Sequence, residues 1–137
     1  MLPPPSDILV IDDEYGMREG VRRILEQKGH RIATAECGRE GIEKGCAKEF
    51  DLYLIDLKMP DVEGPTVLRR IREQFPEALC IIMTAYASIE TAVETTQIGA
   101  WQYIAKPFTP EKISAALQDL RGSLRAAASV EIRSLRD

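Results

Sequence analysis

Short apolar segments alternate with longer segments of helical periodicity along most of this chain of 137 residues. The strand-like runs are Asp7–Ile11, Arg31–Ala35, Asp51–Ile55, Ala78–Met83 and Gln102–Ala105. Three of them are almost continuously apolar, which is typical of strands covered on both faces. Because strict strand–helix alternation places helices over both faces of a mostly parallel sheet, the pattern predicts an α/β fold with a doubly wound, parallel, five-stranded sheet.

Apolar residues at helical spacing predict five helices between and after these runs. The helices include Val21, Ile42, Leu68, Val93 and Leu117, respectively. Capping residues indicate where several of them begin and end. Gly29 should close the first helix, Pro65 suits the first turn of the third, and the fourth should be capped by Ser88 and stopped at Gly99.

The composition is that of a globular protein, with 45% hydrophobic and 29% charged residues. The longest apolar run, Ala78–Met83, is far shorter than the about 20 residues that span a bilayer. The first residues contain neither the basic nor the apolar region of a secretory signal. The cysteines, Cys37, Cys46 and Cys80, are odd in number and form no C-x-x-C pair. A membrane protein, a secreted disulfide scaffold and a cysteine-built zinc module are therefore disfavoured, and free thiols in the cytoplasm are expected.

The net charge of −4 disfavours direct binding to nucleic acid, whose phosphates need basic partners. The chain length suits one domain. We expect that domain at residues 1–122, followed by a C-terminal helical extension or linker at residues 123–137. The apolar residues of this last segment are too few to predict a coiled coil.

Polar side chains follow four of the predicted strands at the point where each strand ends. They are Asp12, Asp13, Asp56, Thr84 and Lys106. Because the carboxyl ends of parallel strands meet at one edge of the sheet, these side chains should converge there. Each residue alone also has a structural explanation, as a helix cap, a turn residue or a strand-end hydroxyl. It is the combination of five suitable residues at one edge that favours a functional site.

Three carboxylates packed together repel one another, so a proton or a cation is expected among them. Oxygen ligands with room for water suit Mg²⁺ or Mn²⁺. The single histidine, His30, precedes a strand and is expected at the opposite edge. A carboxylate beside such a cation can attack phosphorus, and Asp56 is the candidate nucleophile because it follows its strand alone. Lys106 and Thr84 could then stabilise phosphoryl oxygens.

At these residues the chain resembles the receiver domains of response regulators in two-component signalling. The resemblance implies a flavodoxin-like sheet of strand order 2-1-3-4-5. It implies that Asp56, in LIDLKMPDVEG, is the phosphoacceptor and that Thr84, in MTAYA, is the switch hydroxyl. It also implies that Lys106, in AKPF, contacts phosphate and precedes Pro107 through a cis peptide bond.

The same resemblance assigns the metal ligands and the switch aromatic. Asp13 is the expected direct ligand and Asp12 acts largely through water, with the backbone carbonyl of Lys58 as a further ligand beside Asp56. Tyr103 matches the aromatic residue whose rotamer follows the switch hydroxyl.

The stretch Met83–Phe108 resembles the nitrogen-regulation (NtrC-like) transcription activators most. The implied partner is a sensor histidine kinase or phosphotransfer protein, and the implied output is transcriptional control. A homodimer through the surface of the fourth helix, fifth strand and fifth helix, or through the C-terminal helix, stays an open alternative. No membrane partner is expected.

Three other functions are weaker alternatives. An aspartate-nucleophile phosphatase or phosphotransferase usually has a second Asp two residues after the nucleophile, where this chain has Lys58. We therefore expect no turnover of an external substrate. A flavin or dinucleotide site needs a glycine-rich turn after the first strand, where this chain has Asp12, Asp13 and Glu14. A DNA-binding module is disfavoured by the acidic charge.

Overall fold

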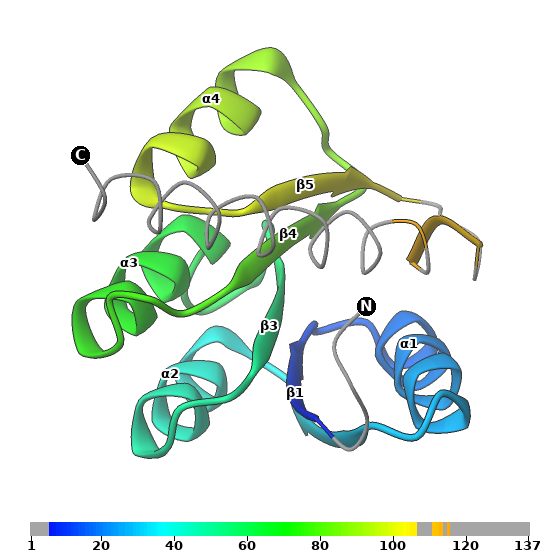
Figure 1. Cartoon of the computed structure of the whole chain (residues 1–137). Coiled ribbons are helices and arrows are strands. Elements are labelled where there is room, and N and C mark those ends of the chain that lie inside the picture. Colours follow the sequence, from blue (N-terminus) through cyan, green and yellow to red (C-terminus); the bar gives the residue numbers. More distant parts are fainter. Residues whose placement is uncertain (1–5, 107–110, 114, 116–137) are drawn as a thin grey trace, which may run out of the picture. The chain divides into compact units, whose positions relative to one another are not determined.

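The computed structural model describes residues 6–106, 111–113 and 115 (Figure 1). The chain divides into two compact units, of which one is Pro4–Pro107 and the other comprises Met1–Pro3 and Phe108–Asp137. Within the second unit, residues 111–113 and 115 are helical. Most of the expected fifth helix, the extension at residues 123–137 and the bond to Pro107 lie outside the described residues. The strands and helices of the sheet belong to the first unit, Pro4–Pro107.

Strands and helices alternate without exception through the first unit. Their bounds are β1 Asp7–Ile11, α1 Tyr15–Gln27, β2 Arg31–Ala35, α2 Gly38–Ala47, β3 Leu52–Asp56, α3 Gly64–Gln74, β4 Cys80–Thr84, α4 Ile89–Ile98 and β5 Gln102–Ala105. All neighbouring strands are parallel, and their order is β2-β1-β3-β4-β5. The predicted fold class and strand order are therefore confirmed.

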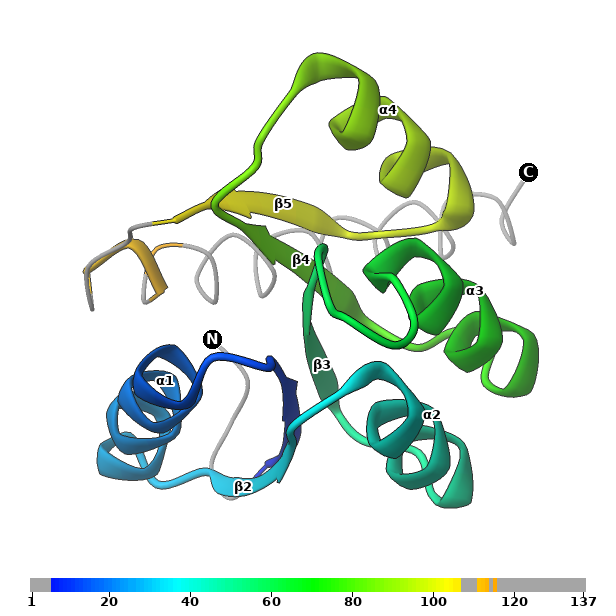
Figure 2. The same ribbon diagram turned by 180° about the vertical axis from the view of Figure 1, so that it is seen from behind.

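Helices cover both faces of this sheet. Figures 1 and 2 show α1 on one side and the neighbouring helices α2, α3 and α4 along the other. After β1 the chain moves outward to β2, and it then returns across β1 to β3. The loops that follow β1 and β3 therefore diverge, and this divergence opens a crevice at the carboxyl ends of these strands.

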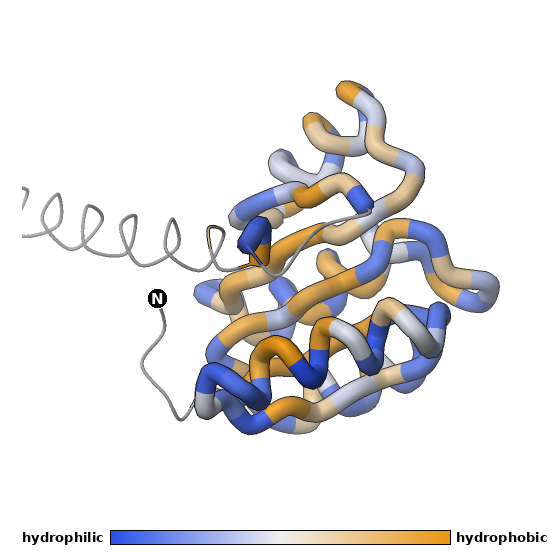
Figure 3. The backbone as a smooth tube through the Cα atoms, turned by 90° about the vertical axis from the view of Figure 1, so that its right-hand side faces the viewer, coloured by the Kyte–Doolittle hydropathy of each residue, from blue (hydrophilic) through white to orange (hydrophobic). Residues whose placement is uncertain are grey.

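The core is centred on β3 and β4, in which every residue is buried. Figure 3 shows hydrophobic residues gathered in the central strands. The phenol of Tyr53 is fully buried, and hydrogen bonds satisfy it: its hydroxyl accepts from Phe50 N at 3.0 Å and donates to Gly45 O at 3.0 Å. Burial on both faces explains why these strands lack the polar alternation of a half-exposed sheet.

Helix α4 is bounded as its sequence predicts but is the least buried helix of this unit. Ser88 caps it by accepting a hydrogen bond from Thr91 N at 3.1 Å, and Gly99 ends it with a φ of 121°. Ile89 is 85% exposed and Val93 is 50% exposed. No helix among the described residues is long and apolar enough to cross a membrane.

Candidate functional site

Three carboxylates meet at the carboxyl edge of the sheet. Asp12 and Asp13 follow β1, and Asp56 is the last residue of β3. Oxygen atoms of the three side chains lie within 4.8 Å of one another. Asp12 and Asp56 are buried, whereas Asp13 is exposed. The neighbouring strands β1 and β3 thus produce the cluster that parallel pairing predicts.

Lys106 adds one positive charge to this cluster. Its Nζ lies 2.8 Å from Asp12 Oδ2 and 3.4 Å from Asp56 Oδ1. The side chain is 6% exposed although the residue directly follows β5. The Lys106 backbone continues the pairing of β5 with β4, since its N–H donates to Thr84 O. Sheet pairing therefore places the ammonium between two carboxylates that are distant in sequence.

The charges and the burial of the cluster shift the pKa values of both Asp56 and Lys106. Burial, and next the charge on Asp12, raise the pKa of Asp56 to about 7 although Lys106 opposes the rise. Burial by itself would lower the pKa of Lys106, but the hydrogen bond to Asp12 and the two carboxylate charges raise it overall. One ammonium does not neutralise three carboxylates, so the cluster favours binding of a further cation or a proton.

The carboxylates differ in how far their oxygens are already engaged. Asp12 Oδ1 accepts a hydrogen bond from Glu14 N at 3.0 Å, and its Oδ2 accepts from Lys106. Asp56 Oδ1 accepts a longer hydrogen bond from Lys106, at 3.4 Å. Asp13 and Asp56 line an open pocket of about 500 Å³, together with Lys106. The remaining walls are Glu14, Lys58, Met59, Pro60, Ala85 and Tyr86. The pocket can admit a phosphoryl group and a hydrated divalent ion at the Asp56 side chain.

Lys58 lies at the rim of this pocket, where its side chain is 55% exposed and its Nζ is 4.0 Å from Glu63 Oε1. The exposed ammonium does not reach the acidic cluster as that of Lys106 does. The expected role of Lys58, through its backbone carbonyl, stays a prediction.

The two expected switch residues have separate partners. Thr84 is fully buried at the end of β4, and its Oγ1 accepts a hydrogen bond from Tyr86 N at 2.9 Å. The Tyr103 hydroxyl lies 2.6 Å from Thr91 Oγ1 and 3.3 Å from Ser88 N. Tyr103 on β5 is thus attached to the first turn of α4.

Two residues near the site have no counterpart among the sequence predictions. Arg18 on α1 is buried, and its Nη1 donates to Asp12 O at 2.8 Å. Asp61, in the loop after β3, accepts hydrogen bonds from Gly38 N at 2.9 Å and Arg39 N at 2.8 Å. These bonds hold the pKa of Asp61 below its usual range. The Asp61 carboxylate therefore caps α2 across a long sequence separation, for which no local pattern gives a signal.

Comparison with known proteins identifies the family of this chain. Residues 8–118 match the response regulator receiver domain family. The transcriptional regulatory protein ZraR of Escherichia coli (strain K12) is 37% identical over 112 residues, which are 82% of this chain and 25% of ZraR. The chain therefore spans about a quarter of the length of this curated relative.

Solved structures have the same fold. A CheY-like receiver domain protein from Methanospirillum hungatei JF-1 matches with a TM-score of 0.84 and 30% identity, over 90% of this chain and 98% of that protein. A response regulator from Burkholderia pseudomallei, solved with a phosphorylated aspartic acid, calcium ion and citrate, matches with a TM-score of 0.78 and 32% identity. That match covers 92% of this chain and 74% of the other.

Proposed function

Because the chain belongs to the family of response regulator receiver domains, we propose that it is a phosphorylation-dependent signalling switch whose phosphoacceptor is Asp56. The observation that carries this proposal is the position of Asp56. Its carboxylate is 7% exposed, lines the pocket and lies 3.4 Å from the Lys106 ammonium. A largely buried nucleophile that faces a pocket beside a cation suits formation of an aspartyl phosphate.

The donor set fits a divalent cation. Carboxylate oxygens of Asp12, Asp13 and Asp56 lie within 4.8 Å of one another, and one lysine leaves their charge incompletely balanced. Hard oxygen ligands at an open, water-accessible site suit Mg²⁺ or Mn²⁺. We propose that these side chains and the Lys58 carbonyl hold the ion. The bound ion would supply positive charge for phosphoryl oxygens.

Each residue has a defined part in phosphoryl transfer. A carboxylate oxygen of Asp56 forms the new P–O bond while the P–N bond of a donor phosphohistidine breaks, and the released imidazole takes up a proton. Lys106 remains beside Asp56 and pairs with a phosphoryl oxygen. Thr84 donates its hydroxyl proton to another such oxygen once its Oγ1 moves away from Tyr86 N. This chain supplies positioning and charge for a single transfer, and we propose no turnover of an external substrate.

The conformational output passes through Thr84 and Tyr103. Movement of Thr84 toward the phosphoryl group vacates space beside β5, into which the Tyr103 ring turns. The Tyr103 hydroxyl then leaves Thr91 and Ser88, so the first turn of α4 is released. Phosphorylation thereby shifts the population of a two-state surface that comprises α4, β5 and the helix that follows them.

The chain acts in the cytoplasm in this proposal, and its partner is a sensor histidine kinase or a phosphotransfer protein. Residues 1–122 form the receiver, and residues 123–137 are a helical extension or linker. The output is transcriptional control, which the name of the relative ZraR supports, or homodimerisation through the α4 surface or the C-terminal helix. Nucleic acid is not bound directly by this acidic chain, and no membrane is bound.

Phosphorylation by acetyl phosphate and Mg²⁺ tests the proposal. Intact-mass measurement should show one added phosphoryl group per chain, and this group should be sensitive to hydroxylamine. Asp56→Asn should abolish the addition. Asp51→Asn is the matched control, because Asp51 precedes the opposite end of the same strand and its carboxylate accepts from Asp7 N. Undiminished labelling of Asp56→Asn would refute the assignment.

The same reaction mixture tests the main alternative. An aspartate-nucleophile phosphatase or phosphotransferase would release many equivalents of phosphate from a phosphoester substrate. The side chain two residues after Asp56 is Lys58, a cation that cannot serve as the carboxylic general acid. We therefore expect one transfer per chain without multiple turnover.

A further inference from the structure

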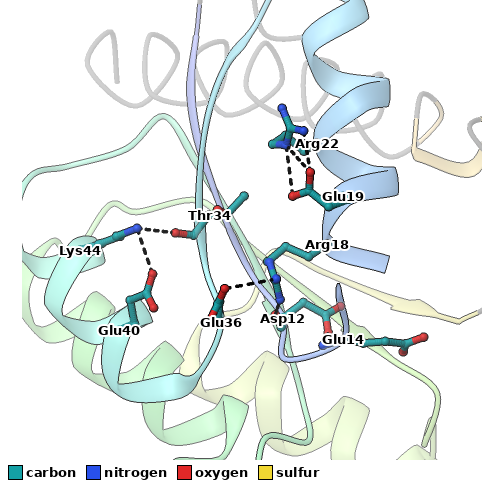
Figure 4. A network of polar contacts seen from close by, with 9 residues as sticks. All are labelled: Asp12, Glu14, Arg18, Glu19, Arg22, Thr34, Glu36, Glu40 and Lys44. Atoms are coloured by element: carbon teal, nitrogen blue, oxygen red, sulfur yellow. Dashed lines mark hydrogen bonds and ion pairs between the residues drawn. The ribbon is translucent and has the colours of Figure 1, made fainter. Parts of the chain in front are cut away.

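The guanidinium of Arg18 is a buried cation that contacts the backbone of Asp12, whereas Lys106 contacts the Asp12 carboxylate. Arg18 lies near the start of α1 and is 5% exposed. Its Nη1 donates to the backbone oxygen of Asp12 at 2.8 Å, and its Nη2 lies 3.5 Å from Glu36 Oε1 (Figure 4). Its Cζ lies 5.5 Å from the centre of the Tyr15 ring. Arg18 thus connects the end of β1 with the residue that follows β2.

We propose that Arg18 is a positioning residue for the cation site, an inference that rests on the proposed function. The oxygen that Arg18 holds belongs to the peptide that joins Asp12 to Asp13. The orientation of this peptide decides where the Asp13 carboxylate points relative to Asp56. A hydrogen bond from a buried guanidinium to this oxygen therefore fixes Asp13, the least buried carboxylate of the cluster, without touching it.

The contacts of Arg18 indicate that its main interaction is the hydrogen bond to the Asp12 backbone. Burying a guanidinium is costly unless strong partners compensate. The carboxylate within reach, Glu36, has a side chain that is 73% exposed, and the separation of 3.5 Å is long for a charge-assisted hydrogen bond. The short bond goes instead to the backbone of the acidic cluster. Burial of this charge is best explained by the peptide it orients.

Arg22, one turn further along α1, provides a matched comparison. Its guanidinium pairs with Glu19 and Glu26 on its own helix, and its side chain is 32% exposed. Figure 4 shows the Arg22 pair away from the end of β1, where Arg18 lies. Replacing Arg22 removes the same kind of charge from the same helix without freeing the peptide between Asp12 and Asp13.

Binding of Mn²⁺ alone, measured from the electron paramagnetic resonance of the free ion, tests this role without any phosphoryl transfer. Arg18→Ala is expected to weaken Mn²⁺ binding by about 10-fold, as loss of a supporting hydrogen bond at a metal site commonly does. Arg18→Lys retains the charge and one donor, so it should recover part of the affinity. Arg22→Ala should bind Mn²⁺ as the parent does. Urea unfolding with EDTA measures stability separately.

The direction in which Arg18→Ala changes the Mn²⁺ affinity distinguishes a positioning role from the other roles that a buried arginine can have. If Arg18 acted only through its charge, its removal would tighten Mn²⁺ binding, because one cation would no longer repel another. If its role were only structural, the free energy of unfolding would fall and the affinity of the folded protein would be unchanged. Either result overturns the proposal.

The failure of this inference is distinguishable from failure of the proposed function. If the parent binds Mn²⁺ and Asp13→Asn does not, the proposed cation site is supported. Equal Mn²⁺ affinities of the parent and Arg18→Ala would then refute only the role of Arg18. If the parent binds no Mn²⁺ at all, both proposals fail. If Arg18→Ala does not fold, the Mn²⁺ affinity of Arg18→Lys, which retains a buried cation, is compared with that of the parent instead.

Discussion

Replacement of the Asp56 carboxylate by the isosteric amide, Asp56→Asn, is expected to stabilise the protein in metal-free buffer at alkaline pH. Burial and the charge on Asp12 raise the pKa of Asp56 from 3.8 to about 7. Ionised Asp56 therefore opposes folding, and the amide removes that charge while keeping the shape of the side chain. The same substitution abolishes the proposed phosphoacceptor, so stability and function should change in opposite directions.

The size of the effect follows from the pKa difference. Since each pKa unit corresponds to about 1.4 kcal/mol, ionisation of Asp56 costs the fold on the order of 4 kcal/mol. The amide also loses the contact of Asp56 with Lys106, in which the two atoms are 3.4 Å apart. We therefore expect a net stabilisation of about 2 kcal/mol at pH values above 7.

The stability difference between Asp56→Asn and the parent should depend on pH. Below the unfolded pKa of 3.8 the carboxyl is protonated in both states, so the parent and Asp56→Asn should be similarly stable. Between this value and about 7 only the folded state keeps the proton, so the parent loses stability as the pH rises. The advantage of Asp56→Asn should therefore grow with pH and level off above 7.

Urea unfolding followed by circular dichroism, in EDTA and over this pH range, measures the difference. Adding Mg²⁺ should stabilise the parent more than Asp56→Asn, because the ion binds the folded state. The reasoning would be refuted if Asp56→Asn were no more stable than the parent at alkaline pH, or if its advantage did not change with pH.

Three further predictions concern the elements around the pocket. Asp61→Asn should destabilise the protein at neutral pH, because the pKa of Asp61 is lowered by the amides of α2, and the effect should fade in urea unfolding as the pH falls below 3.8. Gly64→Ala should lower the free energy of unfolding by about 1–3 kcal/mol and slow labelling by acetyl phosphate, because the added Cβ would overlap the backbone oxygen of Asp56. Unchanged stability and an unchanged labelling rate would contradict this. Tyr103→Phe should accelerate amide hydrogen exchange in the first turn of α4, because the hydroxyl contacts with Thr91 and Ser88 are lost.

The strands were predictable because both their burial and their pairing are visible in short runs of sequence. The structure reproduces the predicted bounds of β1, β2 and β5. The fourth strand begins at Cys80 and not at Ala78, because Ala78 N donates to Phe75 O and so belongs to the turn after α3. The third and fourth strands also extend one residue further, so that Asp56 pairs with Met83 within the sheet.

The meeting of the three carboxylates and Lys106 was predictable, because parallel strands bring their carboxyl ends to one edge. The directions in which individual side chains point could not be predicted from the sequence. The attachment of the Tyr103 hydroxyl to α4 depends on a rotamer that tertiary packing selects. The bonds from Arg18 to Asp12 O and from α2 to Asp61 use backbone groups, which have no signature in the sequence.

Lys106 lies 94 residues after Asp12 in the sequence, so the charge balance of the pocket depends on a segment that is synthesised long after β1. A nascent chain that has formed β1 and β3 already holds its carboxylates together, but it lacks the counter-charge until β5 has paired with β4. Such an intermediate would be a poor phosphoacceptor. On the proposed function, phosphorylation of Asp56 would therefore be confined to molecules in which β5 has paired with β4.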